Sequence, residues 1–224
     1  MSDTTPRLRI SRRSGKVRVT ADPGVPVSVD GGTLETHADG WHEIHSTGSS
    51  TLEVKCPTGS DLMISTSSGG IEVRGEVGSV KVTTKSGNLE IERASEIDAR
   101  GASGKVDVGA CSGECHVVFV SGKVHIGEAG KAVVATVSGN IEAEEVDNAE
   151  VKTVSGNIEL GARGGGHLSA RSISGSVRIS VPDGDQPATR LKSMSGRISC
   201  ECPEGNDGEI TAKTVSGRIK VTCR

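Results

Sequence analysis

Apolar and polar residues alternate along most of this 224-residue chain, in short runs that meet at the dipeptide Ser-Gly. The dipeptide recurs with its serine at positions 68, 86, 103, 121, 138, 155, 174, 195 and 216, at intervals of 17 to 21 residues. Mostly apolar side chains occupy the third and fifth positions after each serine, and the fourth and sixth positions before it. Alternation with a period of two predicts β-strands that bury one face.

Two short strands per repeat cannot enclose a core alone, but coils stacked on similar neighbours can. We therefore predict an all-β protein dominated by a parallel β-solenoid of about 17–21 residues per coil, right-handed as parallel connections usually are. Glycine at each corner permits a positive φ or a close backbone approach. The longer final repeats, with insertions such as GARGGGH and CPEGNDGE, predict loops that protrude on one side.

The first residues follow the pattern less closely. Leu8 to Val19 match one coil, whereas the segment around Trp41 is typical of short antiparallel or irregular strands. Because an open solenoid end needs a cap, we predict an irregular β N-terminal cap over residues 1–64 and a solenoid over residues 65–224. The last coil is expected to run to Arg224, which leaves no sequence to cover its outer edge.

The repeats TVSGNIE, SGKVHIG, SISGSVRI and TVSGRIKV resemble the bacterial putative-adhesin domain, a β-strand-repeat family of unknown function. The resemblance covers about residues 65–224. It implies attachment at a surface and supplies no functional residue to carry over. The architecture alone is also similar to that of the bactofilins, which are cytoskeletal polymers built from a small β-solenoid.

Composition argues against several activities. Aromatic residues make up 1% of the chain, so a carbohydrate-active solenoid enzyme would lack its sugar platforms. The net charge of −3 gives no bias toward nucleic acid. The N-terminus MSDTTPRLRI has no apolar signal region, and no run is long enough for a membrane span. We therefore expect a cytoplasmic protein whose six cysteines are reduced thiols.

Two groups of residues are candidate metal ligands: Cys111, Cys115 and His116, and separately His37, His42 and His45. The inward parity of Cys115, Cys200 and Cys223 predicts core packing for the cysteines, with a zinc site as the alternative. The three histidines differ in strand parity and lack a carboxylate pair, so we expect them to be solvated. We predict no cofactor, no metal and no small-molecule substrate.

Two columns of charge form the candidate interaction surface. Four residues after the serine the earlier coils are mostly acidic, and three residues before it the later coils are basic. The acidic column contains Glu72, Glu90, Asp107, Glu142 and Glu159, and the basic column contains Lys152, Arg171, Lys192 and Lys213. Coils about 4.8 Å apart would stack like charges, which costs stability unless a partner relieves it.

These features predict a non-enzymatic structural or protein-interaction scaffold that self-associates or binds a protein. We expect contact through the sides, because Arg7–Arg18 and Arg218–Arg224 would make both ends basic and mutually repulsive. Two alternatives remain open, a regulatory module that binds a partner in envelope-stress sensing and a surface adhesin.

Overall fold

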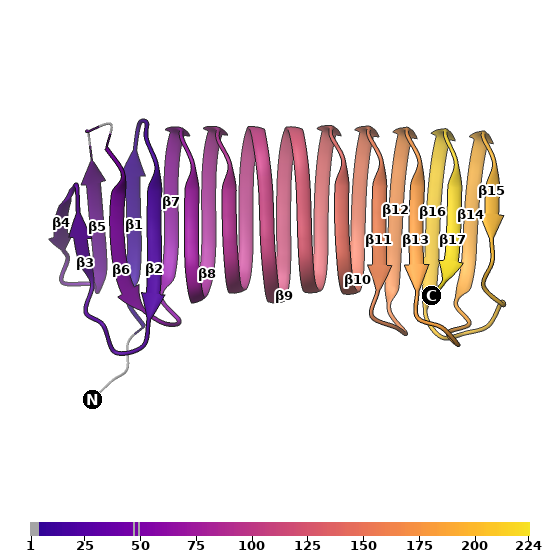
Figure 1. The fold of residues 1–224 in the computed structure, drawn as a ribbon, viewed down its shortest axis with the longest axis horizontal. Helices are drawn as coiled ribbons and strands as arrows, with labels where there is room; N and C mark the ends of the chain where they lie inside the picture. Colours follow the sequence, from indigo (N-terminus) through magenta and orange to yellow (C-terminus); the bar gives the residue numbers. More distant parts are fainter. Residues whose placement is uncertain (1–4, 47, 49) are drawn as a thin grey trace. The chain divides into compact units, whose positions relative to one another are not determined.

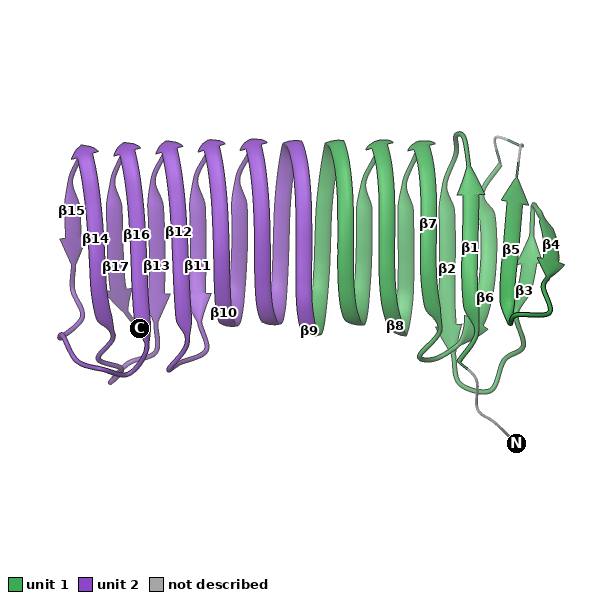
Figure 2. Ribbon diagram, turned by 180° about the vertical axis from the view of Figure 1, so that it is seen from behind, with its two compact units in different colours: residues 1–112 green, residues 113–224 purple. Residues whose placement is uncertain are grey.

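The computed structural model describes residues 5–46, 48 and 50–224, and the chain divides into two compact units, residues 1–112 and 113–224 (Figures 1 and 2). These described residues form no helix, and therefore none long and apolar enough to cross a membrane. Both units are built from β-strands, and the strand β9 (Leu89–Ser138) belongs to both. The all-β prediction is confirmed.

Unit 1 winds as a parallel solenoid. Its strands are β1 (Arg7–Arg12), β2 (Val17–Asp22), β3 (Ser28–Asp30), β4 (Thr33–Thr36), β5 (Trp41–Ser46), β6 (Leu52–Pro57), β7 (Asp61–Ser68), β8 (Ile71–Ser86) and the first part of β9. β7 pairs in parallel with β8, and β8 pairs in parallel with β9. Thr66 and Thr84, 18 residues apart, share a 3.1 Å hydroxyl hydrogen bond across one such pair.

The first coil in the sequence is not the outermost coil of unit 1. β1 pairs with β5 on one side and β7 on the other, and β2 lies in the same way between β6 and β8. The outermost coil is therefore β5–β6, and the antiparallel strands β4 and β3 cover its outer edge (Figure 1). The predicted cap is confirmed in β3 and β4. Trp41, by contrast, starts a regular parallel strand, and the boundary at residue 64 stays a prediction.

Unit 2 repeats the same coil. It contains the rest of β9, followed by β10 (Ile141–Ser155), β11 (Ile158–Ala162), β12 (His167–Ser174), β13 (Val177–Val181), β14 (Ala188–Ser195), β15 (Ile198–Cys200), β16 (Glu209–Ser216) and β17 (Ile219–Cys223). β10 pairs in parallel with β9, β11 and β12. Thr136 and Thr153, 17 residues apart, are joined by a 3.0 Å hydrogen bond. The handedness of the winding stays a prediction.

The last coils of unit 2 are not stacked in sequence order. β16 pairs with β12 on one side and with β14 on the other, while β17 lies between β13 and β15. The C-terminal coil β16–β17 is thus internal, and the outermost coil of unit 2 is β14–β15 (Figure 2). The expectation that the chain ends in the uncovered coil is wrong. The loops that permit the exchange lie on one side, as predicted, after β11, β13 and β15 (Figure 1).

The core consists of the predicted inward columns. Ile141, Ile158 and Val177 are at most 1% exposed, and alternate residues of the other inner coils behave in the same way. The exception is the outermost coil, where Ile198 is 42% exposed and Cys200 is also exposed. These side chains have the inward parity but no further coil to cover them, because nothing stacks beyond β15 among the described strands.

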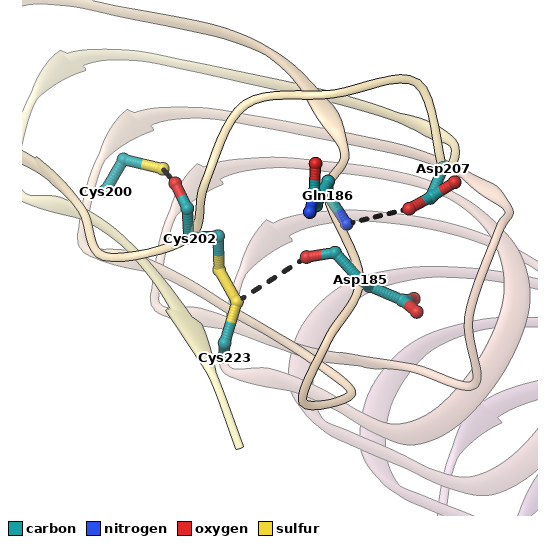
Figure 3. The surroundings of a disulfide bond; sticks show 6 residues. All are labelled: Asp185, Gln186, Cys200, Cys202, Asp207 and Cys223. Carbon is teal, nitrogen blue, oxygen red and sulfur yellow. Dashed lines mark hydrogen bonds between the residues drawn. A yellow bond between two sulfur atoms is a disulfide. The ribbon is translucent and has the colours of Figure 1, made fainter.

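The cysteines divide into two groups. Cys56, Cys111 and Cys115 are buried thiols outside the disulfide, which agrees with core packing, whereas Cys200 is exposed and does not. Cys202 and Cys223, however, form a disulfide, so the prediction of six reduced thiols is wrong (Figure 3). The pairing was hidden in the sequence because it depends on β15 lying beside β17, which brings the loop after β15 to the end of the chain.

Candidate interaction surface

The acidic column of unit 1 is largely neutralised within the chain. The carboxylate of Glu72 is 6% exposed and lies 2.5 Å from the Lys16 ammonium and 3.3 Å from Arg18 Nε, with Arg74 as a third partner. The Lys16 ammonium and the two guanidinium groups lower the pKa of Glu72 to about 2, although desolvation opposes them. These ion pairs link β2 to β8, so the Glu72 carboxylate is already neutralised by cations of unit 1.

The other two acidic positions of unit 1 are more exposed. Glu90 pairs in register with Glu72 and its side chain points to solvent. Asp107 forms an ion pair with Lys105, two positions earlier on the same strand. The structure therefore confirms the stacked placement of Glu72 and Glu90, while a role for any of these residues in partner binding stays a prediction.

In unit 2 the acidic positions also have basic partners. Lys123 lies 2.8 Å from Glu142 and lowers the pKa of that carboxyl group. Arg178 lies 2.5 Å from Glu159, on the next coil. An acidic surface that is already paired offers little free charge to a second molecule.

The basic column is different. In register, Lys152 lies beside Arg171, Arg171 beside Lys213, and Lys213 beside Lys192. Lys152 pairs with Glu150 at 2.5 Å and, with a smaller effect from Arg171, lowers its pKa. Arg171, Lys213 and Lys192 are exposed, and none of them has an ion-pair partner among the residues that the structure describes. The order differs from that of the sequence because the last two coils are exchanged.

An exposed aliphatic column, which the sequence analysis missed, runs beside the basic one. It occupies the position directly before the serine of the last six Ser-Gly dipeptides, and comprises Val120, Val137, Val154, Ile173, Val215 and Met194 at 54%, 50%, 44%, 52%, 44% and 84% exposure. The signal was present in the repeats, since this outward position should be polar and is not. Isolated exposed apolar residues are normal, but a column of six along one face indicates a contact surface.

The two columns meet at the outer end of unit 2. A shallow groove of about 530 Å³ is lined there by Leu191, Met194, Ile198 and Val215, and by the cations Arg171, Lys192 and Lys213. The groove combines an apolar floor with three positive charges. It is suited to a ligand that is both apolar and acidic.

The three histidines considered as candidate metal ligands each contact another side chain. His37 and His45 both approach Glu43, at 3.2 and 3.6 Å, and His42 instead contacts Thr36. A different trio in the described chain, His125, Glu142 and Glu144, has ligand atoms within 4.8 Å of one another. Ion pairing accounts for this trio, because Lys123 occupies Glu142 and Glu144 lies 3.1 Å from His125 Nε2.

Comparison with known proteins identifies the fold and the family. The chain is similar to a putative adhesin from Bacteroides fragilis NCTC 9343, at 14% identity over 97% of this chain and 93% of that one, with a TM-score of 0.50. It also aligns with a putative cell adhesion protein from Clostridium sporogenes ATCC 15579, at 10% identity over 98% and 93% of the two chains, with a TM-score of 0.24. None of the curated proteins compared with the chain matches it. The family pattern described as Toastrack DUF4097 matches residues 7–223, and the chain therefore belongs to that family.

Proposed function

We propose that this protein is a non-enzymatic scaffold that binds an acidic protein surface through the basic and aliphatic columns of unit 2. The observation that carries the proposal is the stack of Arg171, Lys213 and Lys192 on adjacent coils without ion-pair partners among the described residues. Like charges at the spacing of neighbouring strands repel one another, so a bound carboxylate would relieve a cost that the folded chain carries by itself.

The sequence suggested that the acidic column of one copy pairs with the basic column of another, and the ion pairs in the structure make this arrangement less favourable. The carboxylates of Glu142 and Glu159 already have cations at 2.8 and 2.5 Å, so they gain little from a second copy. A foreign acidic segment, or an acidic part of this chain outside that column, is the better complement. Exposed ion pairs contribute at most about 1 kcal/mol each, so binding should need several contacts and weaken in salt.

The experiment compares two triple variants of equal net charge. The first carries Arg171→Gln, Lys192→Gln and Lys213→Gln, and the control carries Lys55→Gln, Lys81→Gln and Lys85→Gln at exposed positions of unit 1. Immobilised wild-type protein and the control should retain a stoichiometric protein partner at low salt, and the first variant should lose it. Equal retention by both variants, or no stoichiometric partner for the wild type, would contradict the proposal.

A second candidate, attachment or sensing at the cell surface, is favoured by one observation. The Cys202–Cys223 disulfide is a feature of oxidising compartments, whereas cytoplasmic thiols are normally kept reduced. Trapping the cysteines with an alkylating reagent in intact cells would decide between the cytoplasmic proposal and this one. Six alkylated cysteines would support the cytoplasm, and four with an intact disulfide would support an oxidising site.

A further inference from the structure

The outermost coil of unit 2 is open on one side. β14 pairs with β16 alone, and β15 pairs with β17 alone, so among the described strands nothing occupies the other edge of either one. Figure 2 shows these two strands at the end of unit 2. A free strand edge offers unpaired N–H and C=O groups to a further strand.

The apolar interior is exposed at the same place. Leu191, in register with fully buried Ala212, is only half-buried, and Ile198, in register with fully buried Ile219, is 42% exposed. The outward face of β14 is basic, since Lys192 is exposed there without an ion-pair partner in the described chain. A strand added to this edge would place apolar side chains against Leu191 and acidic side chains against Lys192.

The cap of unit 1 also has a free strand edge, but its outward face is acidic instead of basic. Among the described strands β4 pairs only with β5, and in its register Leu34 lies beside buried Ile44 while Glu35 lies beside Glu43. Leu34 therefore has the inward parity and is nevertheless 38% exposed. Glu35 points outward, has no basic partner within the described residues, and meets a like charge in Glu43.

The second cap strand continues this pattern. Within the described part of the chain β3 pairs only with β6, with Val29 beside buried Val54 and Asp30 beside Glu53. Val29 thus lies on the inward side and exposed Asp30 on the outward side. The cap presents two free edges, each with an apolar inward residue and an acidic outward residue, and these complement the basic outward face and open core of β14 and β15.

We propose that copies of this protein associate head to tail, with the free edges of β14 and β15 in one copy against the free edges of β4 and β3 in the next. This inference rests on the proposed scaffold function and names a second copy of the chain as one partner. It replaces the expectation that both ends are basic and repel. That expectation assumed that the chain termini form the ends, whereas β1–β2 and β16–β17 each lie one coil inside.

A two-fold contact between two β14 edges is disfavoured by charge. In an antiparallel pair centred on Leu191, Arg190 of one copy would lie opposite Lys192 of the other, and centring on Lys192 would place that residue opposite itself. The head-to-tail contact instead joins Lys192 to Glu35. Because the edge of one coil is narrow, the contact belongs to the small, weak class of interfaces, and roughly micromolar to millimolar protein is needed to populate it.

The test is sedimentation velocity of Lys192→Glu and Glu35→Lys, alone and mixed in equal amounts. The wild type should form chains of increasing mass as concentration rises, and each single variant should stay monomeric. In the mixture, the carboxylate introduced into β14 of one variant meets the ammonium introduced into β4 of the other. The remaining ends form the wild-type pair of Lys192 with Glu35, so chains in which the two variants alternate should form. Lys81→Glu, at an exposed position of unit 1 away from these edges, is the control and should associate like the wild type.

Three results would overturn the inference. A wild type that remains monomeric over the whole range excludes the contact, and in that case a foreign acidic partner can still satisfy the scaffold test above. Stronger association of Lys192→Glu alone would show that the lysine protects the edge from pairing. Association of the mixture that is no stronger than that of the single variants would place any contact elsewhere. The double variant Arg171→Gln/Lys213→Gln, which leaves both edges intact, should lose the foreign partner and keep head-to-tail association, which separates the two proposals.

Discussion

Replacing the corner glycine Gly139 by alanine should be strongly destabilising, for a reason more specific than its conformation. Gly139 has φ +151°, where residues with a side chain are rare, and a Cβ built there would lie 1.8 Å from the carbonyl oxygen of Gly122 on the adjacent coil. Real Cβ atoms essentially never approach closer than 3.0 Å, so the two backbones must separate by more than 1 Å. The same contact recurs at Gly156, where the Cβ would lie 2.0 Å from the oxygen of Gly139.

Two contributions set the magnitude. Forcing alanine into a glycine-only conformation costs roughly 1–3 kcal/mol. Moving the Gly139 corner away from Gly122 also disturbs the 3.0 Å hydrogen bond that the Gly139 amide donates to the Ser155 carbonyl on the coil at its other side, which is worth roughly 1 kcal/mol. We therefore expect Gly139→Ala to reduce the free energy of unfolding of unit 2 by about 3 kcal/mol.

Two other glycines separate the contributions. Gly165 has φ +64° and no atom within 4 Å of a Cβ, so Gly165→Ala should cost only about 1 kcal/mol. Gly70 has neither a positive φ nor a contact closer than 3.9 Å, so Gly70→Ala should be nearly neutral. Urea denaturation followed by circular dichroism measures all three variants. If Gly139→Ala cost no more than Gly165→Ala, the close approach of the coils would not be what demands glycine.

Three further outcomes are expected. Glu72→Gln should lower the stability of unit 1 at pH 7 and flatten the pH dependence of that stability. Because the pKa of Glu72 in the folded protein is lowered to about 2, its stabilisation is complete above the ordinary carboxyl pKa of about 4.3 and is lost as pH falls toward 2. Equal curves of stability against pH for the variant and the wild type would contradict this. Reduction of the Cys202–Cys223 disulfide, which spans 21 residues, should lower the stability of unit 2 by about 3 kcal/mol in the wild type and have no effect on Cys202→Ser, with calorimetry as the measurement. Elemental analysis of protein purified without chelator should find no stoichiometric zinc or iron, because Lys123 occupies Glu142 in the His125 trio; one tightly held metal ion per chain would refute this.

The stacking of coils and the core residues were predictable from the sequence because each copy of the repeat contains the same inward positions and the same corner. The alternation around Ser-Gly fixes which side chains point inward, and the corner glycine marks where the strands turn. The order of the last two coils was hard to predict, since β14 and β16 both carry the Ser-Gly repeat and either could pair with β12. Which of the two strands pairs with β12 depends on the conformations of the long loops, and these loops lie outside the repeat pattern.

One sequence signal for the outermost coil was nevertheless present. At the inward positions of β14 the chain has Thr189 and Leu191, where the internal strand β16 has Ile210 and Ala212. A polar residue such as Thr189 at an inward position suits a coil that faces water. The basic column was correctly located in the sequence. The sequence did not show that these cations lack ion-pair partners, because the carboxylates of the chain are paired with other cations that lie next to them only in the folded structure.

The placement of β16–β17 inside unit 2 changes what truncation and synthesis do to this protein. In most solenoids the terminal repeat touches one neighbour, so proteolytic trimming removes one repeat and leaves the rest intact. Here the coil β16–β17 fills a slot between two coils, and losing it would detach β14–β15 from all the described strands with which it pairs. During translation that slot stays empty until β17 has left the ribosome, so the outermost coil, although made earlier, can be fixed in place only after β17 has been made.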